Sequence, residues 1–411
     1  MYQGKRVVGV ELMGGKGTRL WPWVEEGLRS KATYELAGMP LAYFNAKLAE
    51  KAEIPYLIAA VEFNKKEIKD RLDFDGFNFK RKPQFVAPRR KFFKKNEVAT
   101  FRGTADAVLQ CQGLQAVEQS DYVVVLPCDH LTNIDLPEFI DKAIFNAEHY
   151  GAVITTAAME KETSEIAKNF GNPKGDENGM VTEWIEKPLQ PISNLAGLGI
   201  YAGPTKEVMR AITEGGFDFG GDVLKYLKDR GQLYVHTFPA GKYYWNDIGK
   251  PSLLLKAGID LIDGIEGIEV PFRKIESLDT QYGGRIKNCL VQDNGQPPIY
   301  GAVTDCVLGK RVVVDKGTKV GCSIVGENVN LKNSENHGRE VIIRRSIIGE
   351  NSIVSDTDLF TVGLGVNSTL HKCHVARGKG IRMHPYVNKT EETISTHVFR
   401  ERELRELEDW Q

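Results

Sequence analysis

A short repeat in the last third of the chain restricts the fold more than any other feature. Two near copies, "SIVGEN" (323–328) and "SIIGEN" (346–351), lie among β-branched residues that are followed by glycine and a turn. One small apolar residue in every six, with glycine close behind, suits a coil with three short faces. Stacked coils of this kind form a parallel β-helix, which we predict for residues 291–395. A set of unrelated β-turns is the alternative.

Before the repeat, short apolar runs alternate with amphipathic stretches. The runs that are typical of buried strands are 56–61, 122–129, 152–159 and 233–238. Between two of them, residues 136–151 carry apolar side chains at helical spacing, with Asp135 placed as the N-cap. This alternation predicts an α/β domain with a mostly parallel, Rossmann-like sheet.

These patterns divide the chain into an α/β domain and a β-helix domain with shorter segments beside it. The predicted segments are an α/β domain (1–265), a linker (266–290), the β-helix (291–395) and a charged C-terminal helix (396–411). The length of 411 residues agrees with more than one domain.

Composition restricts the partners and the compartment. The formal net charge is −1, so the whole chain has no field that would attract nucleic acid or a membrane. The six cysteines are scattered without a C-x-x-C pair, which fits a reducing compartment and no zinc site. The N-terminus has no apolar signal core, and no run reaches 18 apolar residues. We expect a soluble cytoplasmic protein.

Close to the N-terminus, the stretch "GVELMGGKGTRLWPW" (9–23) joins a strand-like run to a basic, glycine-rich loop. The spacing matches neither the P-loop nor the dinucleotide fingerprint. Even so, Gly14, Gly15 and Gly17 let backbone N–H groups approach an anion, and Lys16 and Arg19 add positive charge. The stretch predicts a phosphate cradle, and an ordinary strand-to-helix turn is the alternative.

Two carboxylates follow strand-like runs farther along. Asp129 stands in "LPCDH", just past a buried strand, and Asp247 stands in "YYWNDIGKP", before Gly249. A carboxylate at the end of a strand is well placed to hold a divalent cation over phosphates. Each residue taken alone is also consistent with a helix cap or a turn.

Three further stretches are candidates for binding. In "FRGTADAV" (101–108) a Gly-Thr turn opens a helix whose N–H groups suit a base or a phosphate. In "EWIEKP" (183–188) Glu186 suits sugar hydroxyls and Lys187 suits a phosphate, although the pair alone is also an ordinary surface ion pair. The stretch "DFGGDVL" (218–224) is a turn and helix cap by default.

The order of these motifs is more specific than any one of them. The series "GGKGTRL", "RSKA", "FRGTADAV", "LPCDH", "EWIEKP", "LAGLGIYAG", "DFGGDVL" and "YYWNDIGKP", followed by a hexapeptide β-helix, resembles the sugar-1-phosphate nucleotidyltransferase family over nearly the whole chain. Within that family the chain looks most like the ADP-glucose pyrophosphorylases. The resemblance implies a left-handed β-helix and the reaction of an NTP with a sugar 1-phosphate, typically ATP with glucose 1-phosphate, to give an NDP-sugar and pyrophosphate.

The resemblance also implies roles for individual residues. The glycine loop would hold the nucleotide and Arg19 its triphosphate, Lys31 matches the family's lysine after the loop, and Asp129 and Asp247 would share Mg²⁺. The implied nucleotide-binding residues are Met13, Gly14, Gly15, Gly17, Thr18, Gly103 and Thr104. The implied sugar-phosphate residues are Glu186, Lys187 and Gly197.

The chain departs from the family pattern at several positions. Lys31 is followed by Ala32 where the family usually has proline, which predicts a looser loop. Pro88 and Arg89 stand where adenine-specific members tend to have paired glutamines, and Phe101 replaces a tyrosine. Gly197 replaces a serine. These departures affect residues expected to recognise the base and the sugar. The residues expected to bind the metal and the phosphates are retained.

The segment 80–96 contains eight Lys or Arg residues. We predict a site for a phosphorylated metabolite or inorganic phosphate there, with contacts from Arg89, Arg90 and Lys91. A solvated loop is one alternative, and nucleic-acid binding through the interleaved Phe92 and Phe93 is another.

Two other functions share this domain plan. The first is a non-catalytic regulatory or scaffold subunit, as in some translation-initiation exchange factors, although the retained charged residues favour an active enzyme. The second is an enzyme with additional acetyltransferase activity in the β-helix, for which His371 and His374 are available. β-Helix domains often join subunits, so we expect a homo-oligomer, a dimer or a tetramer.

Overall fold

The computed structural model groups the chain into two compact units. One contains Met1–Gly15 and Ala42–Trp245, and the other contains Lys16–Leu41 and Asn246–Gln411. The described residues are 2, 4–20, 22–24, 29–89, 100–166, 168–292, 297–334, 340–371, 373–375, 381–383, 387–390 and 393–394. The predicted C-terminal helix at 396–411 lies outside them. No helix in the described part of the chain is long and apolar enough to cross a membrane.

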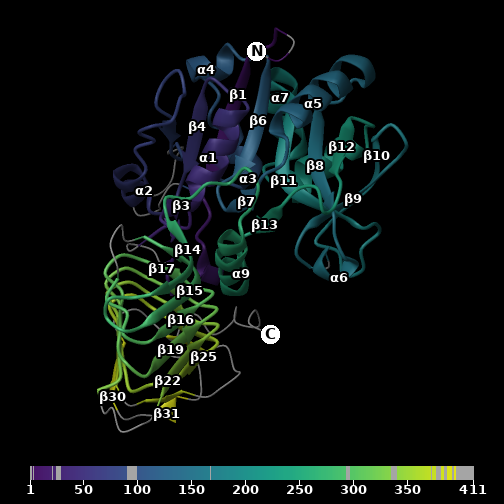
Figure 1. The fold of residues 1–411 in the computed structure, drawn as a ribbon. Helices are drawn as coiled ribbons and strands as arrows, with labels where there is room; N and C mark the ends of the chain where they lie inside the picture. The colour runs from purple at the N-terminus through teal and green to yellow at the C-terminus, as the bar shows by residue number, and fades with distance from the viewer. Residues whose placement is uncertain are drawn as a thin grey trace. The chain divides into compact units, whose positions relative to one another are not determined.

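A seven-stranded sheet forms the centre of the first unit (Figure 1). Its strands run in the order β12 (Leu233–Phe238), β8 (Ile154–Glu160), β11 (Leu195–Pro204), β6 (Tyr122–Pro127), β1 (Val7–Met13), β4 (Leu57–Val61) and β5 (Gln84–Val86). β1 is parallel to both β4 and β6. β5 is parallel to β4, and β12 is parallel to β8. The predicted Rossmann-like, mostly parallel sheet is therefore confirmed. β11, which was not predicted, is antiparallel to both of its neighbours.

Helices cover the sheet because their apolar residues recur at helical spacing. The described helices of this unit are α1 (Leu41–Lys51), α2 (Lys65–Arg71), α3 (Thr104–Leu109), α4 (Gln115–Glu118), α5 (Leu136–Tyr150), α6 (Thr163–Ile166), α7 (Thr205–Gly215), the π-helical turn η2 (Phe219–Val223) and α8 (Leu224–Lys228). In α5, Asp135 is the predicted N-cap, and its carboxylate accepts from the Glu138 N–H at 2.9 Å. Phe139, Ile140 and Ile144 bury its inner face.

Two short strand pairs carry candidate site residues. β9 (Gly171–Gly175) pairs antiparallel with β10 (Val181–Glu186), and β7 (His130–Thr132) pairs with β13 (Trp245–Asp247). β10 ends at Glu186, and β7 begins directly after Asp129. The local strand geometry thus fixes the positions of both carboxylates.

The second unit contains the predicted β-helix. In its described part, one stack of parallel strands comprises β15 (Arg285–Val291), β16 (Ala302–Thr304), β19 (Thr318–Gly321), β22 (Val341–Arg344) and β25 (Leu359–Phe360). A second comprises β17 (Val307–Leu308), β20 (Ile324–Val325), β23 (Ile347–Ile348), β26 (Val362–Leu364) and β29 (Ile381–Met383). A third comprises β18 (Val313–Val314), β21 (Asn330–Lys332), β24 (Ile353–Ser355), β27 (Thr369–His371) and β30 (Asn388–Thr390). β14 (Arg273–Asp279) pairs with β15, and β28 (His374–Val375) pairs with β31 (Thr393–Ile394).

The repeated "GEN" of the two near copies explains how neighbouring coils stack. Asn328 and Asn351 both adopt positive φ, and the Asn328 amide donates to Asn351 Oδ1 at 2.7 Å. A Cβ on Gly326 would lie 2.8 Å from the Glu350 nitrogen, so a side chain there would collide with the next coil. Glycine therefore permits the close stacking of coils, and asparagine permits the tight corner.

Residues that follow the glycine loop pack on the β-helix within the second unit. The Trp23 indole donates to the Leu364 carbonyl at 3.0 Å, and Arg29 forms an ion pair with Glu350 at 2.8 Å. Helix α9 (Pro251–Asp263) packs on the same domain, because a Cβ on Gly258 would lie 2.9 Å from Ile324. The unit also contains the 3-10 turn η1 (Thr18–Leu20) and the hairpin of β2 (Glu35–Leu36) and β3 (Met39–Pro40).

Candidate active site

The glycine loop begins at the carboxyl end of β1, a central strand of the sheet. Met13 is buried at the end of this strand, and Gly14 and Gly15 follow it directly. Gly17 has a φ of +66°, and a Cβ there would lie 2.6 Å from Val24. Packing and the positive φ both require glycine at position 17, whereas a Cβ on Gly15 would meet no atom of the described residues within 4 Å. Ligands of parallel sheets bind at this edge.

Arg19 and Asp247 lie beside the same glycine in the second unit. A Cβ placed on Gly249 would be 3.2 Å from Asp247 Oδ1 and 3.3 Å from Arg19 Nη2. Arg19 lies on η1, where its side chain is exposed, and Thr18 begins the same turn. The absence of a side chain at Gly249 therefore leaves room for the guanidinium next to the carboxylate.

Lys31 is buried on a tight turn, although no proline follows it. The Thr33 N–H donates to Ser30 Oγ at 3.2 Å, the two hydroxyls lie 2.9 Å apart, and the Tyr34 N–H donates to the Lys31 carbonyl at 3.4 Å. The looser loop expected at Ala32 stays a prediction. Hydrogen bonds around the turn supply the restraint that a proline ring would give, and Lys31 packs its Cβ near Gly17.

In the first unit, Asp129 precedes a firmly held histidine. The side chain of Asp129 is about one fifth exposed, and its Oδ1 lies 3.8 Å from His130 Nε2. The Trp245 indole donates to His130 Nδ1 at 3.1 Å, so the hydrogen of a neutral imidazole lies on Nε2, toward Asp129. The Asn45 amide donates to the His130 carbonyl at 2.7 Å and fixes the backbone.

Each unit carries donor atoms that divalent cations bind. In the first unit Asp129 offers carboxylate oxygens and His130 a ring nitrogen, and in the second unit Asp247 offers carboxylate oxygens. Hard cations prefer oxygen ligands, and the Nδ1 of His130 already accepts from Trp245. The carboxylates are thus the better candidates as ligands, and the His130 ring lies beside Asp129.

Glu186 and Lys187 end the β9–β10 hairpin. Lys187 has a φ of +48°, and its Nζ lies 3.8 Å from Glu186 Oε1. Burial raises the pKa of Glu186, an effect that Lys187 opposes and Asp218 reinforces. A Cβ on Gly220 would lie 2.4 Å from Glu186 Oε2, so the "DFGGD" segment makes room for this carboxylate. The ammonium remains more than half exposed, as binding a phosphate requires.

The structure gives a physical reason for glycine at position 197. A Cβ there would lie 3.1 Å from the Gly171 carbonyl oxygen and 3.4 Å from the Trp184 ring. The Trp184 indole is itself held by the Gly220 carbonyl at 2.9 Å. A serine at this position would require the packing to shift. Glycine, which lacks the serine hydroxyl, allows β11 to approach the β9–β10 hairpin closely.

The turn at Gly103 and Thr104 joins the "DFGGD" segment. The Ala105 and Asp106 N–H groups both donate to the Phe217 carbonyl, at 2.9 and 3.0 Å. The prediction that N–H groups at the start of α3 read a base or a phosphate is therefore wrong for these two groups. Gly103 is required by packing, because its Cβ would lie 2.4 Å from the Phe217 oxygen.

Side chains add a second connection between the same segments. Thr104 Oγ1 donates to Asp218 Oδ2 at 3.0 Å and accepts from the Phe219 N–H at 3.0 Å. Arg102 stacks on Phe217 at 3.3 Å and bonds Asp106 at 2.7 Å. The "FRGTADAV" and "DFGGD" motifs thus form one structural element.

Sequence reasoning missed Glu11. This side chain is fully buried on β1, and neither carboxylate oxygen has a hydrogen-bond partner among the residues that the structure describes. Burial, with the charge of Asp129 adding to it, raises the pKa of Glu11 well above its usual range. A glutamate inside the apolar run before the glycine loop was the available signal.

The remaining candidates lie elsewhere or outside the described residues. The Arg89 guanidinium donates to the Gln112 carbonyl at 3.0 Å, whereas Arg90 and Lys91 lie outside the described residues. In the β-helix, His371 Nδ1 lies 3.7 Å from Asp356 Oδ2. The side chain of His374 lies outside the described part of the chain.

A central parallel sheet, a glycine loop at its carboxyl edge, carboxylates after strands and a β-helix together define a nucleotide-binding transferase. The family model for nucleotidyl transferases matches residues 8–264, and the chain belongs to that family. Three curated relatives share this similarity, and each is a glucose-1-phosphate adenylyltransferase. The Fervidobacterium nodosum protein is 27% identical, covering 87% of this chain and 86% of the relative. The Corynebacterium jeikeium protein is 25% identical, covering 89% and 97%, and the Bacillus thuringiensis protein is 26% identical, covering 87% and 95%.

Proposed function

We propose that this nucleotidyltransferase makes ADP-glucose and pyrophosphate from ATP and glucose 1-phosphate. The observation that carries the proposal is the similarity to glucose-1-phosphate adenylyltransferases over most of both chains. Glu186 and Lys187, a half-buried carboxylate beside an exposed ammonium, support a substrate that has both hydroxyls and a phosphate.

In the proposed reaction, a phosphate oxygen of glucose 1-phosphate forms a bond to the α-phosphorus of ATP. The bond between that phosphorus and the oxygen bridging to the β-phosphate breaks, and pyrophosphate leaves with the electron pair. The protein contributes positioning and charge neutralisation rather than covalent chemistry. We assign Lys187 to the phosphate of the sugar, Glu186 to its hydroxyls, and Arg19 and Lys31 to the triphosphate.

We further propose that Asp129 and Asp247 hold Mg²⁺. Asp247 is two residues from Trp245, whose indole bonds His130 beside Asp129. Two residues of extended chain span at most about 7 Å, so the covalent chain restricts how far the carboxylates can separate. When bound, the cation would neutralise charge on the phosphates. The neighbouring histidine and Trp245 would hold Asp129 in place.

The nucleotide would lie on the loop of Gly14, Gly15 and Gly17, with Met13 and Thr18 beside it. Adenine as the base rests on the relatives, because Pro88, Arg89 and Phe101 depart from the adenine-specific pattern. We propose a cytoplasmic homo-oligomer on the same grounds of family resemblance.

The experiment that tests the proposal measures pyrophosphate release by the full-length chain with Mg²⁺. A panel of ATP, UTP, dTTP, GTP and CTP is crossed with the 1-phosphates of glucose, mannose, galactose and N-acetylglucosamine. We expect the highest kcat/KM for ATP with glucose 1-phosphate. A higher value for another pair would correct the substrates, and no release with any pair would favour a non-catalytic subunit.

A further inference from the structure

One acidic residue at the carboxyl edge of the central sheet, Glu62, has no part in the proposed mechanism. It directly follows Val61, the last residue of β4. β4 lies beside β1 and parallel to it (Figure 1), and Val61 pairs with Met13 where both strands end. Glu62 and Gly14 are therefore the first residues beyond two neighbouring strand ends, at the edge where ligands of parallel sheets bind.

The side chain of Glu62 lies against the first glycine of the loop. A Cβ placed on Gly14 would be 3.5 Å from both the Cβ and the Oε2 of Glu62, which is ordinary van der Waals contact. The chain then turns at Asn64, whose φ is +53°, and enters α2, where the Ile68 N–H donates to the Asn64 carbonyl at 2.9 Å. The backbone after Glu62 is thus held, and the half-buried carboxylate is presented beside the loop.

An aromatic ring borders the same glycine. The Cδ2 atom of Phe101 would also lie 3.5 Å from a Cβ on Gly14. Phe101 is half-buried and packs on the hydrophobic core of the first unit. The start of the glycine loop therefore has both a carboxylate and an aromatic ring as neighbours, and all three segments belong to the first unit.

These two neighbours suit different parts of a nucleotide that lies on the loop. An ionised carboxylate only accepts hydrogen bonds and repels a phosphate, so a group that binds beside Glu62 must be a neutral donor. The ring of Phe101 suits the flat face of a base. The ribose, which joins the base to the phosphates, brings hydroxyl donors. In doubly wound sheets that bind dinucleotides, an acidic residue holds the ribose 2′-hydroxyl while a glycine loop holds the phosphates.

We propose that Glu62 accepts a hydrogen bond from the ribose 2′-hydroxyl and thereby selects ribonucleoside over 2′-deoxyribonucleoside triphosphates. This role rests on the proposed function, because it requires a nucleotide on the glycine loop, and it extends the specificity to the sugar of that nucleotide. A 2′-deoxy substrate lacks the donor, so it loses a hydrogen bond to a charged group that the ribonucleotide makes. An amino group of the base is the other neutral donor, and the experiment separates the two.

Pyrophosphate release by the full-length chain with Mg²⁺ and saturating glucose 1-phosphate tests this role, with ATP compared to dATP and UTP compared to dUTP. For the preferred base we expect kcat/KM to be at least about tenfold higher with the ribonucleotide. In Glu62→Ala this ratio should fall below about threefold, and in Glu62→Gln, which keeps the size of the side chain but not its charge, it should be intermediate. The matched control Asp70→Ala removes an exposed carboxylate of α2 and should retain the full ratio.

Several outcomes would overturn the role of Glu62. Equal use of the ribonucleotide and the deoxyribonucleotide by the unmodified chain is one, and an unchanged ratio in Glu62→Ala, which a merely structural role would give, is another. Purine riboside triphosphate, which lacks the amino group of ATP, tests the other donor. If Glu62 reads the base instead, this analogue rather than dATP is the poor substrate, and the preference for ATP over it disappears in Glu62→Ala.

Isothermal titration calorimetry with ATP and dATP measures the same preference without turnover. We expect the affinity for ATP to exceed that for dATP by at least about tenfold in the unmodified chain and by less than about threefold in Glu62→Ala. Absence of pyrophosphate release with every triphosphate would count against the proposed function. Equal affinities for ATP and dATP, or no binding of either, would count against the role of Glu62.

Discussion

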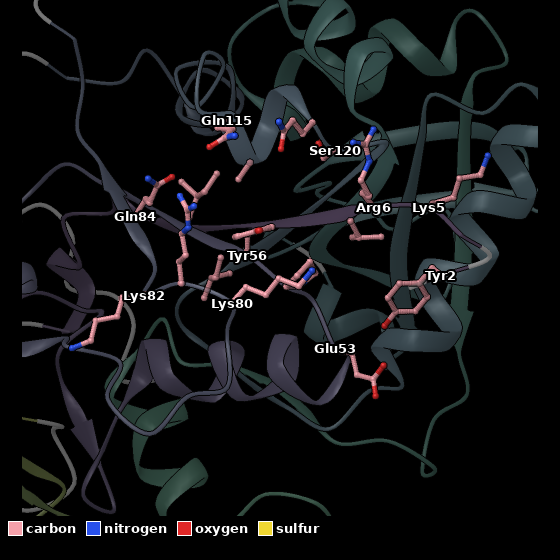
Figure 2. Close-up of a pocket in the computed structure, with 17 residues that line it drawn as sticks. Tyr2, Lys5, Arg6, Glu53, Tyr56, Lys80, Lys82, Gln84, Gln115 and Ser120 are labelled. Carbon is pink, nitrogen blue, oxygen red and sulfur yellow. The ribbon is translucent and has the colours of Figure 1, made fainter.

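The two ends of β1 both carry groups that can bind anions, but the groups differ: backbone N–H groups at one end and side chains at the other. At the carboxyl end, Gly14, Gly15 and Gly17 expose the backbone, and the positive charge comes from side chains farther along the loop. At the amino end, a cavity of about 370 Å³ is lined by lysine, arginine and amide side chains from four separate segments (Figure 2). A site built from the backbone of one loop leaves a continuous motif in the sequence, whereas a cavity lined by side chains of four segments does not.

The largest expected effect concerns the carboxyl end. Asp129→Asn should lower kcat for pyrophosphate release by about a thousandfold, because a charge that holds the proposed cation is lost. Steady-state kinetics with saturating ATP and glucose 1-phosphate measures the change, with circular dichroism to check the fold. Glu177→Gln, on an exposed turn of the same unit, is the control and should retain full activity. A kcat within threefold of the unmodified value would remove Asp129 from the active site.

Removal of divalent cations gives the corresponding test without a mutation. Excess EDTA should abolish pyrophosphate release, and added Mg²⁺ should restore it, because without a cation the two carboxylates add negative charge beside the phosphates. Activity that persists in EDTA would contradict the proposed cation site.

Lys187 should affect one substrate only. Lys187→Ala is expected to raise the KM for glucose 1-phosphate by about 10- to 100-fold and to leave the KM for ATP nearly unchanged. Lys174→Ala, on β9 of the same hairpin and paired with Glu183 at 2.7 Å, provides the matched control. An equal rise for both substrates would indicate that the lysine stabilises the hairpin instead.

The pKa of Glu186 predicts a pH dependence for sugar binding. A buried carboxylate with a raised pKa takes up its proton at a higher pH than an ordinary glutamate, whose pKa is about 4.3. As the pH falls through that raised pKa, the carboxylate can no longer accept from two hydroxyls, so kcat/KM for glucose 1-phosphate should fall. In Glu186→Gln this part of the profile should be flat. An unchanged acidic limb would assign the titration to another group.

Glu11, midway along β1, should affect stability rather than substrate binding. Its pKa is raised in the folded chain, so the folded state binds a proton that the unfolded state releases above about pH 4.3. Stability is therefore lost as the pH rises from that value toward the folded pKa. Glu11→Gln should raise the Tm by at least about 2 °C at pH 8 and by less at pH 5, as measured by thermal unfolding. The same gain at both pH values would show that packing, not ionisation, is responsible.

Local patterns predicted those parts of the molecule that depend on neighbouring residues. Asp135 caps α5 because its carboxylate needs only the N–H three residues later. The near copies at 323–328 and 346–351 predicted stacked coils because each unit repeats the same corner. The glycine loop was visible for the same reason.

Other features depend on residues that meet only in the folded chain. Trp245 holds His130 across more than one hundred residues, and Phe217 uses the N–H groups at the start of α3. The glycine at position 197 is explained by its contact with Trp184, which lies on another strand, β10. The amino-end cavity belongs to the same class, because no single segment contains it.

The stacking of the β-helix has a consequence for protein engineering. Ile324 pairs with Ile347, and Ile347 pairs with Gly363, so successive coils of unequal length keep the same register. The longer coil has its additional residues between β21 and β22, while the Gly326 corner allows no added atom. We expect a foreign peptide or an affinity tag to be accepted between β21 and β22, whereas one inserted at a "GEN" corner would disrupt the stack.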